Sequence, residues 1–227
     1  MHQIKLKQNQ IIKSLSNITD IFFKQSIIDL ANDKRYLRKD PSIDSSIHPC
    51  SDEYFEKART FPIKDYGFPR ACVGVSGSAI IDYMPHFDMF EEIRLAMDKF
   101  VINIGASCNA LSMLYPDNGY IGWHHNGNAP GYNILFTYSI DGEGYFKYYD
   151  YSTKSFVILQ DNPGWNVRVG YYPDENKYPE KIFWHCAETK QRRITIAFVV
   201  NSKSMWENLI DYISEGDFDP AITNVKI

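Results

Sequence analysis

The chain has 227 residues, of which 44% are hydrophobic and 15% aromatic, and its formal net charge is -4. This length suits one domain with a well-buried core, and the composition is that of a globular protein. The mild acidity disfavours broad binding to nucleic acid or to membranes, which needs a dense field of Lys and Arg.

The first hundred residues predict helices separated by loops. Between residues 16 and 33, apolar residues recur near helical spacing, and Ser16 is available as a helix cap. Over residues 34–77, four prolines and mixed charges break this pattern, which indicates a long loop with short strands. Residues 86–100 again carry one apolar face, so we expect a second helix that backs a sheet.

From residue 101 onward the pattern changes to short strands and turns. The turn sequences PDNG, DGEG and DNPG separate about eight apolar or alternating stretches. Regular short strands joined by turns are typical of a sandwich, a barrel or a jelly roll. We expect a single, mainly β domain over 1–227, with helical support and loops in 1–100, the core in 101–203 and a closing helix and tail in 204–227.

The cysteines and three of the histidines suggest no chemistry. The four cysteines are far apart and form no C-x-x-C pair: Cys50, Cys72, Cys108 and Cys186. They indicate neither a zinc cluster nor a disulfide framework, so we expect reduced thiols in a soluble, cytoplasmic protein. Three histidines, at the terminus, in a loop and at a helix start, are interpreted as structural: His2, His48 and His86.

A pair of adjacent histidines in the stretch IGWHHNGNAPG raises the question of a metal site. Because side chains alternate along a strand, His124 and Asn126 point to one face and His125 points to the other. A further histidine, His185, follows in KIFWHCAE, late enough for its strand to return to the first. The tryptophans before the proposed ligands, Trp123 and Trp184, are interpreted as core packing behind the site.

A possible anion anchor follows the second of these histidines. Arg193 and Thr195 share one face of the strand RITIAFVV, whereas Arg192 points to the other face. A buried arginine beside a hydroxyl suits a bidentate, charge-assisted contact with a carboxylate.

The order and spacing of these residues resemble those of the Fe(II)/2-oxoglutarate-dependent oxygenases, whose signature is H-x-D/E, a distant His and then R-x-S/T. GWHHN is similar to the family's GWHxD, and HCAETKQRRIT looks like the end of the motif. The likeness covers about residues 100–200 and is nearest to the prolyl 4-hydroxylase-like branch. In that branch, helices support a double-stranded β-helix, which is a jelly roll.

The resemblance implies a dioxygenase that uses iron, 2-oxoglutarate and dioxygen to hydroxylate a small molecule or a side chain. His124 and His185 are then iron ligands, with Asn126 as the third. Arg193 and Thr195 hold the distal carboxylate of the oxo acid. Four further residues lie on strands that we expect to line the pocket: Tyr115, Asn133, Thr137 and Tyr138. Of these, Tyr115 and Asn133 are assigned to the oxo acid.

The sequence departs from the family at Asn126, where the signature has a carboxylate. An amide oxygen is a neutral, weaker donor, so the affinity for iron should fall. Asn126 either still coordinates, directly or through water, or the pair is His125 and Gly127, as in the H-x-G pattern of the halogenase variant. In a third interpretation the protein is a non-catalytic, ligand-binding jelly roll. A cupin-like enzyme with another metal is a further alternative.

Overall fold

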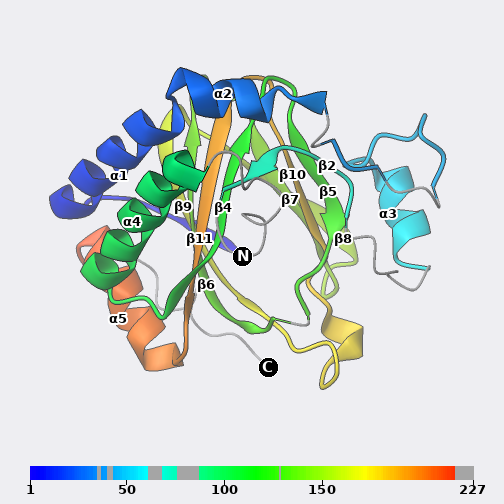
Figure 1. Cartoon of the computed structure of the whole chain (residues 1–227). Helices are drawn as coiled ribbons and strands as arrows, with labels where there is room; N and C mark the ends of the chain where they lie inside the picture. The colour runs from blue at the N-terminus through cyan, green and yellow to red at the C-terminus, as the bar shows by residue number, and fades with distance from the viewer. Residues whose placement is uncertain (35–36, 40–42, 61–67, 76–86, 128, 218–227) are drawn as a thin grey trace.

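Two antiparallel β-sheets face each other in the computed structural model of the chain (Figure 1), which describes residues 1–34, 37–39, 43–60, 68–75, 87–127 and 129–217. The larger sheet has the strand order β1-β9-β6-β11-β4-β3, and the smaller has the order β2-β5-β10-β7-β8. This is a jelly roll, and it confirms the predicted fold class.

The strands of the larger sheet are β1 (His2–Ile4), β3 (Val73–Gly74), β4 (Cys108–Tyr115), β6 (Gly131–Ser139), β9 (Gly164–Tyr172) and β11 (Arg193–Val200). Those of the smaller sheet are β2 (Arg70–Ala71), β5 (Tyr120–His124), β7 (Tyr145–Asp150), β8 (Ser155–Gln160) and β10 (His185–Glu188). Eight strands, β4 to β11, lie in the predicted core. β2 and β3 lie in residues 34–77, where the sequence predicts a loop with short strands, and β1 was not predicted.

Helices cover the outer faces of the two sheets. On the larger sheet lie α1 (Asn9–Phe22), α2 (Gln25–Ala31), α4 (Phe87–Ile104) and α5 (Lys203–Ser214), and on the smaller sheet lies α3 (Asp52–Ala58) (Figure 1). The main core is the layer between the larger sheet and the four helices that cover it, α1, α2, α4 and α5. No helix within the described ranges is long and apolar enough to cross a membrane.

The helix predicted over residues 16–33 is two helices. Ser16 is not a cap, because it lies inside α1 and its hydroxyl donates to the Ile12 carbonyl (3.1 Å). The cap is Gln8, and Lys24, with an extended backbone, separates α1 from α2. Propensity favours Ser at a cap, but the apolar face that packs on the sheet begins a turn and a half earlier, at Ile11.

One further boundary and one additional helix differ from the prediction. Residues 101–104 continue α4 instead of starting a strand, because Ile104 extends the buried face and Gly105, with φ +70°, comes only after it. The helix α3 was not predicted, although Ser51 caps it by accepting from the Tyr54 amide (3.1 Å). Residues 218–227 and His86 lie outside the described residues.

Candidate functional site

Two histidines face each other between the sheets. His124 ends β5 and His185 begins β10, and the two are partners in the antiparallel pairing of these strands. Their ring centroids are 4.2 Å apart. Both are buried, with 8% and 5% of their surface exposed. The structure thus brings together the two imidazoles that the sequence singled out as ligands.

The backbone fixes which nitrogen of each ring is free. His124 Nδ1 lies 2.8 Å from the Gly122 carbonyl oxygen, and His185 Nδ1 lies 3.0 Å from that of Phe183. Because a carbonyl oxygen only accepts hydrogen bonds, both Nδ1 atoms carry the proton, and both Nε2 atoms keep a lone pair. Metal-binding histidines are usually oriented by such a contact, so these rings fit a metal ion.

Both rings are neutral at physiological pH. Burial lowers the pKa of His124 to about 4, against the opposing effect of its hydrogen bond to Gly122. Burial, and then the neighbouring His124, lower the pKa of His185 well below its ordinary value. The neutral imidazole is the form that ligates metal ions, so no proton has to leave before an ion binds.

The metal-free protein should lose stability as the pH falls from about 6.5 toward about 4. In this window the unfolded state binds protons at these histidines and the folded state does not, so the free energy of unfolding decreases. Each histidine contributes a slope of about 1.4 kcal/mol per pH unit. Urea unfolding of chelator-treated protein across this range measures the slope. His124→Gln should lower this slope by about 1.4 kcal/mol per pH unit, because one fewer proton is bound on unfolding. An unchanged slope would show that His124 is not buried in its neutral form.

A cavity of about 170 Å³ lies between the sheets, and both histidines line it. The other predicted site residues that line it are Tyr115, Asn126, Asn133, Thr137, Arg193 and Thr195. The remaining wall is largely apolar, with Phe68, Leu135, Phe146 and Tyr172. Phe68 stacks on His124 with ring centroids 4.1 Å apart, so it helps to keep water from that ring.

Two residues that the sequence analysis considered for the site lie away from the cavity. Tyr138 does not line it, because it follows the inward-facing Thr137 and packs on Phe23 and Trp165 at the helical face. Arg192 is also outside, as predicted, and its amide donates to Asp117 (3.0 Å).

His125 points away from the cavity. Its ring packs edge-on against Trp184 at 4.9 Å, and its Nδ1 lies 3.4 Å from Glu175 Oε2. At Gly127, a Cβ atom would lie 2.6 Å from that of Glu175, so this glycine is required by close packing. The positions of His125 and Gly127 therefore give no support to the H-x-G interpretation.

No described residue that lines the cavity is an aspartate or a glutamate. A metal ion held by two imidazoles and the Asn126 amide would keep its full double positive charge there. An anion from solution would then be needed to neutralise it.

Arg193 is already paired with a carboxylate of the chain. Its Nε donates to Asp161 Oδ2 (2.8 Å), and its Nη1 donates to Thr195 Oγ1 (2.9 Å). Asp161, just after β8, also accepts through Oδ1 from Arg168 Nη2 on β9 (2.6 Å). We call Arg168, Asp161 and Arg193 the buried charge triad, since none is more than 3% exposed.

The buried charge triad keeps one net positive charge. Burial opposes ionisation of Asp161, but Arg193 and Arg168 outweigh it and lower the pKa of this carboxyl. Two guanidinium groups therefore share one carboxylate. Arg168 also has Nε and Nη1 buried without a hydrogen-bond partner. An anion that reaches Arg193 thus enters a field that remains positive.

Sequence reasoning missed Asp161 and Arg168. Asp161 belongs to the turn DNPG, and aspartate is common in turns for reasons that need no partner. Arg168 interrupts the apolar strand WNVRVGYY at an inward-facing position. A charge at such a position needs a partner, and this is the signal that could have found the pair.

No protein-family model matches the chain, and no curated protein matches it. Similar solved structures include a Pseudomonas putida prolyl-4-hydroxylase, at 11% identity and TM-score 0.39, over 88% of this chain and 91% of that one. A full-length Neurospora crassa protein in complex with alpha-KG has 12% identity and TM-score 0.34, over 86% and 72%. The rice dioxygenase for auxin oxidation has 12% identity and TM-score 0.36, over 86% and 70%. At these values, the reaction has to be argued from the side chains of this chain.

Proposed function

We propose that the protein is an Fe(II)- and 2-oxoglutarate-dependent oxygenase, most simply a hydroxylase. The observation that carries the proposal is the pair of buried, neutral imidazoles, His124 and His185, whose Nε2 atoms are both free. A buried arginine, Arg193, lines the same cavity. Two nitrogen ligands and an anion anchor in one apolar cavity suit a metal ion and an oxo acid.

Seven residues of the cavity have a role in this proposal. His124 and His185 hold the ion through Nε2, and the Asn126 amide oxygen offers a third donor. Bound iron, with the oxo acid and dioxygen, supplies the oxidising chemistry. Arg193, with Thr195, holds the distal carboxylate of the oxo acid. Tyr115 and Asn133 also line the cavity and contact the oxo acid.

The walls of the cavity select the substrate and exclude water. Phe68, Phe146 and Tyr172 present apolar surface near the two histidines. An apolar group of a small molecule or of a side chain fits such a wall better than a charged group does. The same wall keeps water from the reacting centre.

Asn126 makes iron and the oxo acid depend on each other. The three protein donors are neutral, so the negative charge at the metal has to come from the oxo acid. The oxo acid should therefore raise the affinity for Fe(II), and by thermodynamic linkage Fe(II) should raise the affinity for the oxo acid by the same factor.

Anaerobic addition of Fe(II) and 2-oxoglutarate tests the proposal. We expect the visible charge-transfer band of the iron–oxo acid chelate only when both are present. Uptake of metal without this band would favour a cupin-like enzyme that ignores the oxo acid. Absence of metal uptake would favour a non-catalytic, ligand-binding jelly roll.

Asn126→Asp should tighten Fe(II) binding in the absence of the oxo acid by roughly tenfold or more, which corresponds to about 1.4 kcal/mol. The physical reason is that an aspartate adds an anionic ligand. Anaerobic equilibrium dialysis measures the affinity. Asn118→Asp, in an exposed turn, adds the same charge away from the cavity and should change nothing. Equal affinities in wild type and Asn126→Asp would show that residue 126 is not a ligand.

A further inference from the structure

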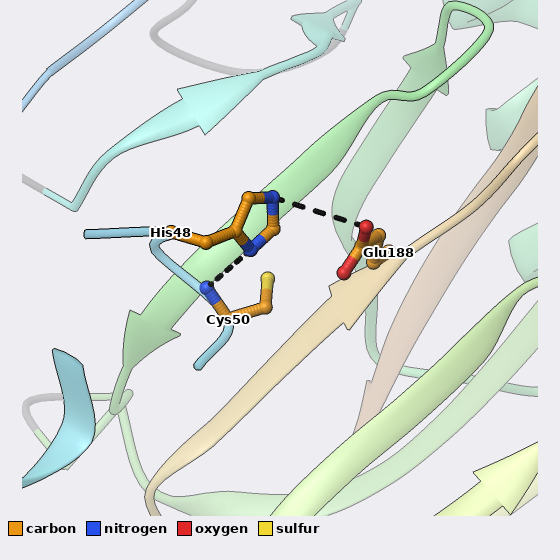
Figure 2. A group of neighbouring side chains, drawn as sticks. All are labelled: His48, Cys50 and Glu188. Carbon is orange, nitrogen blue, oxygen red and sulfur yellow. Dashed lines mark hydrogen bonds and ion pairs between the residues drawn. The ribbon is translucent and has the colours of Figure 1, made fainter. Parts of the chain in front are cut away.

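A second group of side chains of the types that bind metal ions lies on the outer side of the smaller sheet. His48 and Cys50 belong to the loop before α3, and Glu188 faces them from β10 (Figure 2). Their ligand atoms, one from each residue, all lie within 4.8 Å of one another. We propose that His48, Cys50 and Glu188 form a binding site for a zinc-class divalent cation, separate from the cavity.

The distance between the histidine and carboxylate donors is nearer to that of two ligands of a tetrahedral ion than to that of a hydrogen bond. His48 Nε2 and Glu188 Oε1 are 3.8 Å apart, which is too long for a hydrogen bond. Zinc bonds of 2.0–2.3 Å at the tetrahedral angle place neighbouring ligand atoms about 3.3–3.6 Å apart. A small closure of the loop toward β10 would bring the pair into this range.

Contacts around the group hold its ligands in place. Tyr145 donates to Glu188 Oε2 (2.6 Å), which leaves Oε1 directed at His48. The His48 ring lies edge-on to Tyr120, with centroids 5.4 Å apart. A ligating carboxylate is commonly oriented through its second oxygen in this way.

The sulfur of Cys50 is the donor that gives the site a preference for zinc-class ions. Its Sγ lies 3.4 Å from the Ile121 carbonyl oxygen and 3.6 Å from that of Ala187. These are contacts of the protonated thiol, so an ion that binds the sulfur has to displace its proton. Sulfur, nitrogen and oxygen donors together suit zinc or cobalt rather than magnesium or calcium.

Loading an ion changes one contact of the unloaded site. The Cys50 amide donates to His48 Nδ1 at 3.3 Å, so the free ring carries its proton on Nε2. An ion at Nε2 moves this proton to Nδ1 and breaks the contact, which is at the long end of the hydrogen-bond range. The ion in turn joins the loop to β10, the strand that carries His185.

Cobalt is the probe that tests the site, because a thiolate–Co²⁺ bond gives an intense near-ultraviolet charge-transfer band. The protein is the full chain with His124→Ala and His185→Ala, which removes the ligands in the cavity. We expect one equivalent of Co²⁺ to produce the band, Zn²⁺ to displace it, and the melting temperature to rise with either ion. The Cys50 amide resonance should shift on zinc binding.

Matched variants decide whether these residues are the ligands. In this background, Cys50→Ser should abolish the band, whereas Cys108→Ser, which removes an exposed thiol elsewhere, should preserve it. Glu188→Gln and His48→Gln keep the thiol and should weaken Co²⁺ binding at least tenfold, which provides a test if Cys50→Ser does not fold. A missing band, a band that survives Cys50→Ser, or one that is lost in Cys108→Ser would overturn the proposal.

Discussion

Replacing His185 with alanine is expected to weaken Fe(II) binding by at least about 100-fold, since removing even an outer partner of a metal ligand costs 10–100-fold. The side chain is buried in register with His124, and its Nε2 is free toward the cavity. Without this ring, only one imidazole and an amide remain, and neither carries charge. Anaerobic equilibrium dialysis with Fe(II), with and without 2-oxoglutarate, measures the loss.

His125→Ala is the matched control, because it removes an imidazole one residue from His124 that packs on Trp184. We expect Fe(II) affinity to stay within about twofold of wild type. Unchanged affinity in His185→Ala would count heavily against the cavity as a metal site. A loss in His125→Ala, with no loss in His124→Ala, would revive the pattern of His125 and Gly127.

The strands of the fold could be predicted because their information is local. Turn sequences separate the stretches, and the strand that carries Thr137 lines the cavity as expected, although its neighbour Tyr138 faces the helices. The helical boundaries depended on distant contacts. α3 is only seven residues long, and it forms because Phe55 is buried against Trp123 (4.9 Å) and Trp184 (6.0 Å). A seven-residue pattern in a loop-like stretch does not reveal that contact.

The candidate site could be predicted in part for a related reason. Alternation and the resemblance to a known signature were enough to select His124, His185 and Arg193, which line one cavity. The signature has no position for Asp161, whose pairing with Arg193 depends on how the turn after β8 folds. The sequence offers no reason to treat His48 as more than structural, because its neighbour Glu188 is 140 residues away along the chain.

Replacing Asp161 with asparagine is expected to lower the free energy of unfolding by about 3–5 kcal/mol, the typical cost of removing one partner from a buried ion pair. The variant keeps the shape of the side chain but leaves Arg168 and Arg193 buried without a counter-charge. Urea unfolding measures the loss. Asp117→Asn removes the exposed partner of Arg192 and should cost less than about 1 kcal/mol. Equal effects of the two substitutions would show that the triad does not stabilise the fold.

A substitution at Arg168 changes the charge of the triad without changing any residue of the cavity wall, because Arg168 does not line the cavity. Arg168→Met leaves Asp161 and Arg193 as a neutral pair, so the affinity for 2-oxoglutarate should fall although every described cavity residue is unchanged. Adding Asp161→Asn to this variant restores one net positive charge and should recover the affinity. It also leaves Arg193 buried without a counter-charge, so it should lower the free energy of unfolding further. Calorimetric titration with 2-oxoglutarate in the presence of Mn²⁺ compares the three proteins. If Arg168→Met binds the oxo acid as tightly as wild type does, the contacts of Arg193 alone hold the anion.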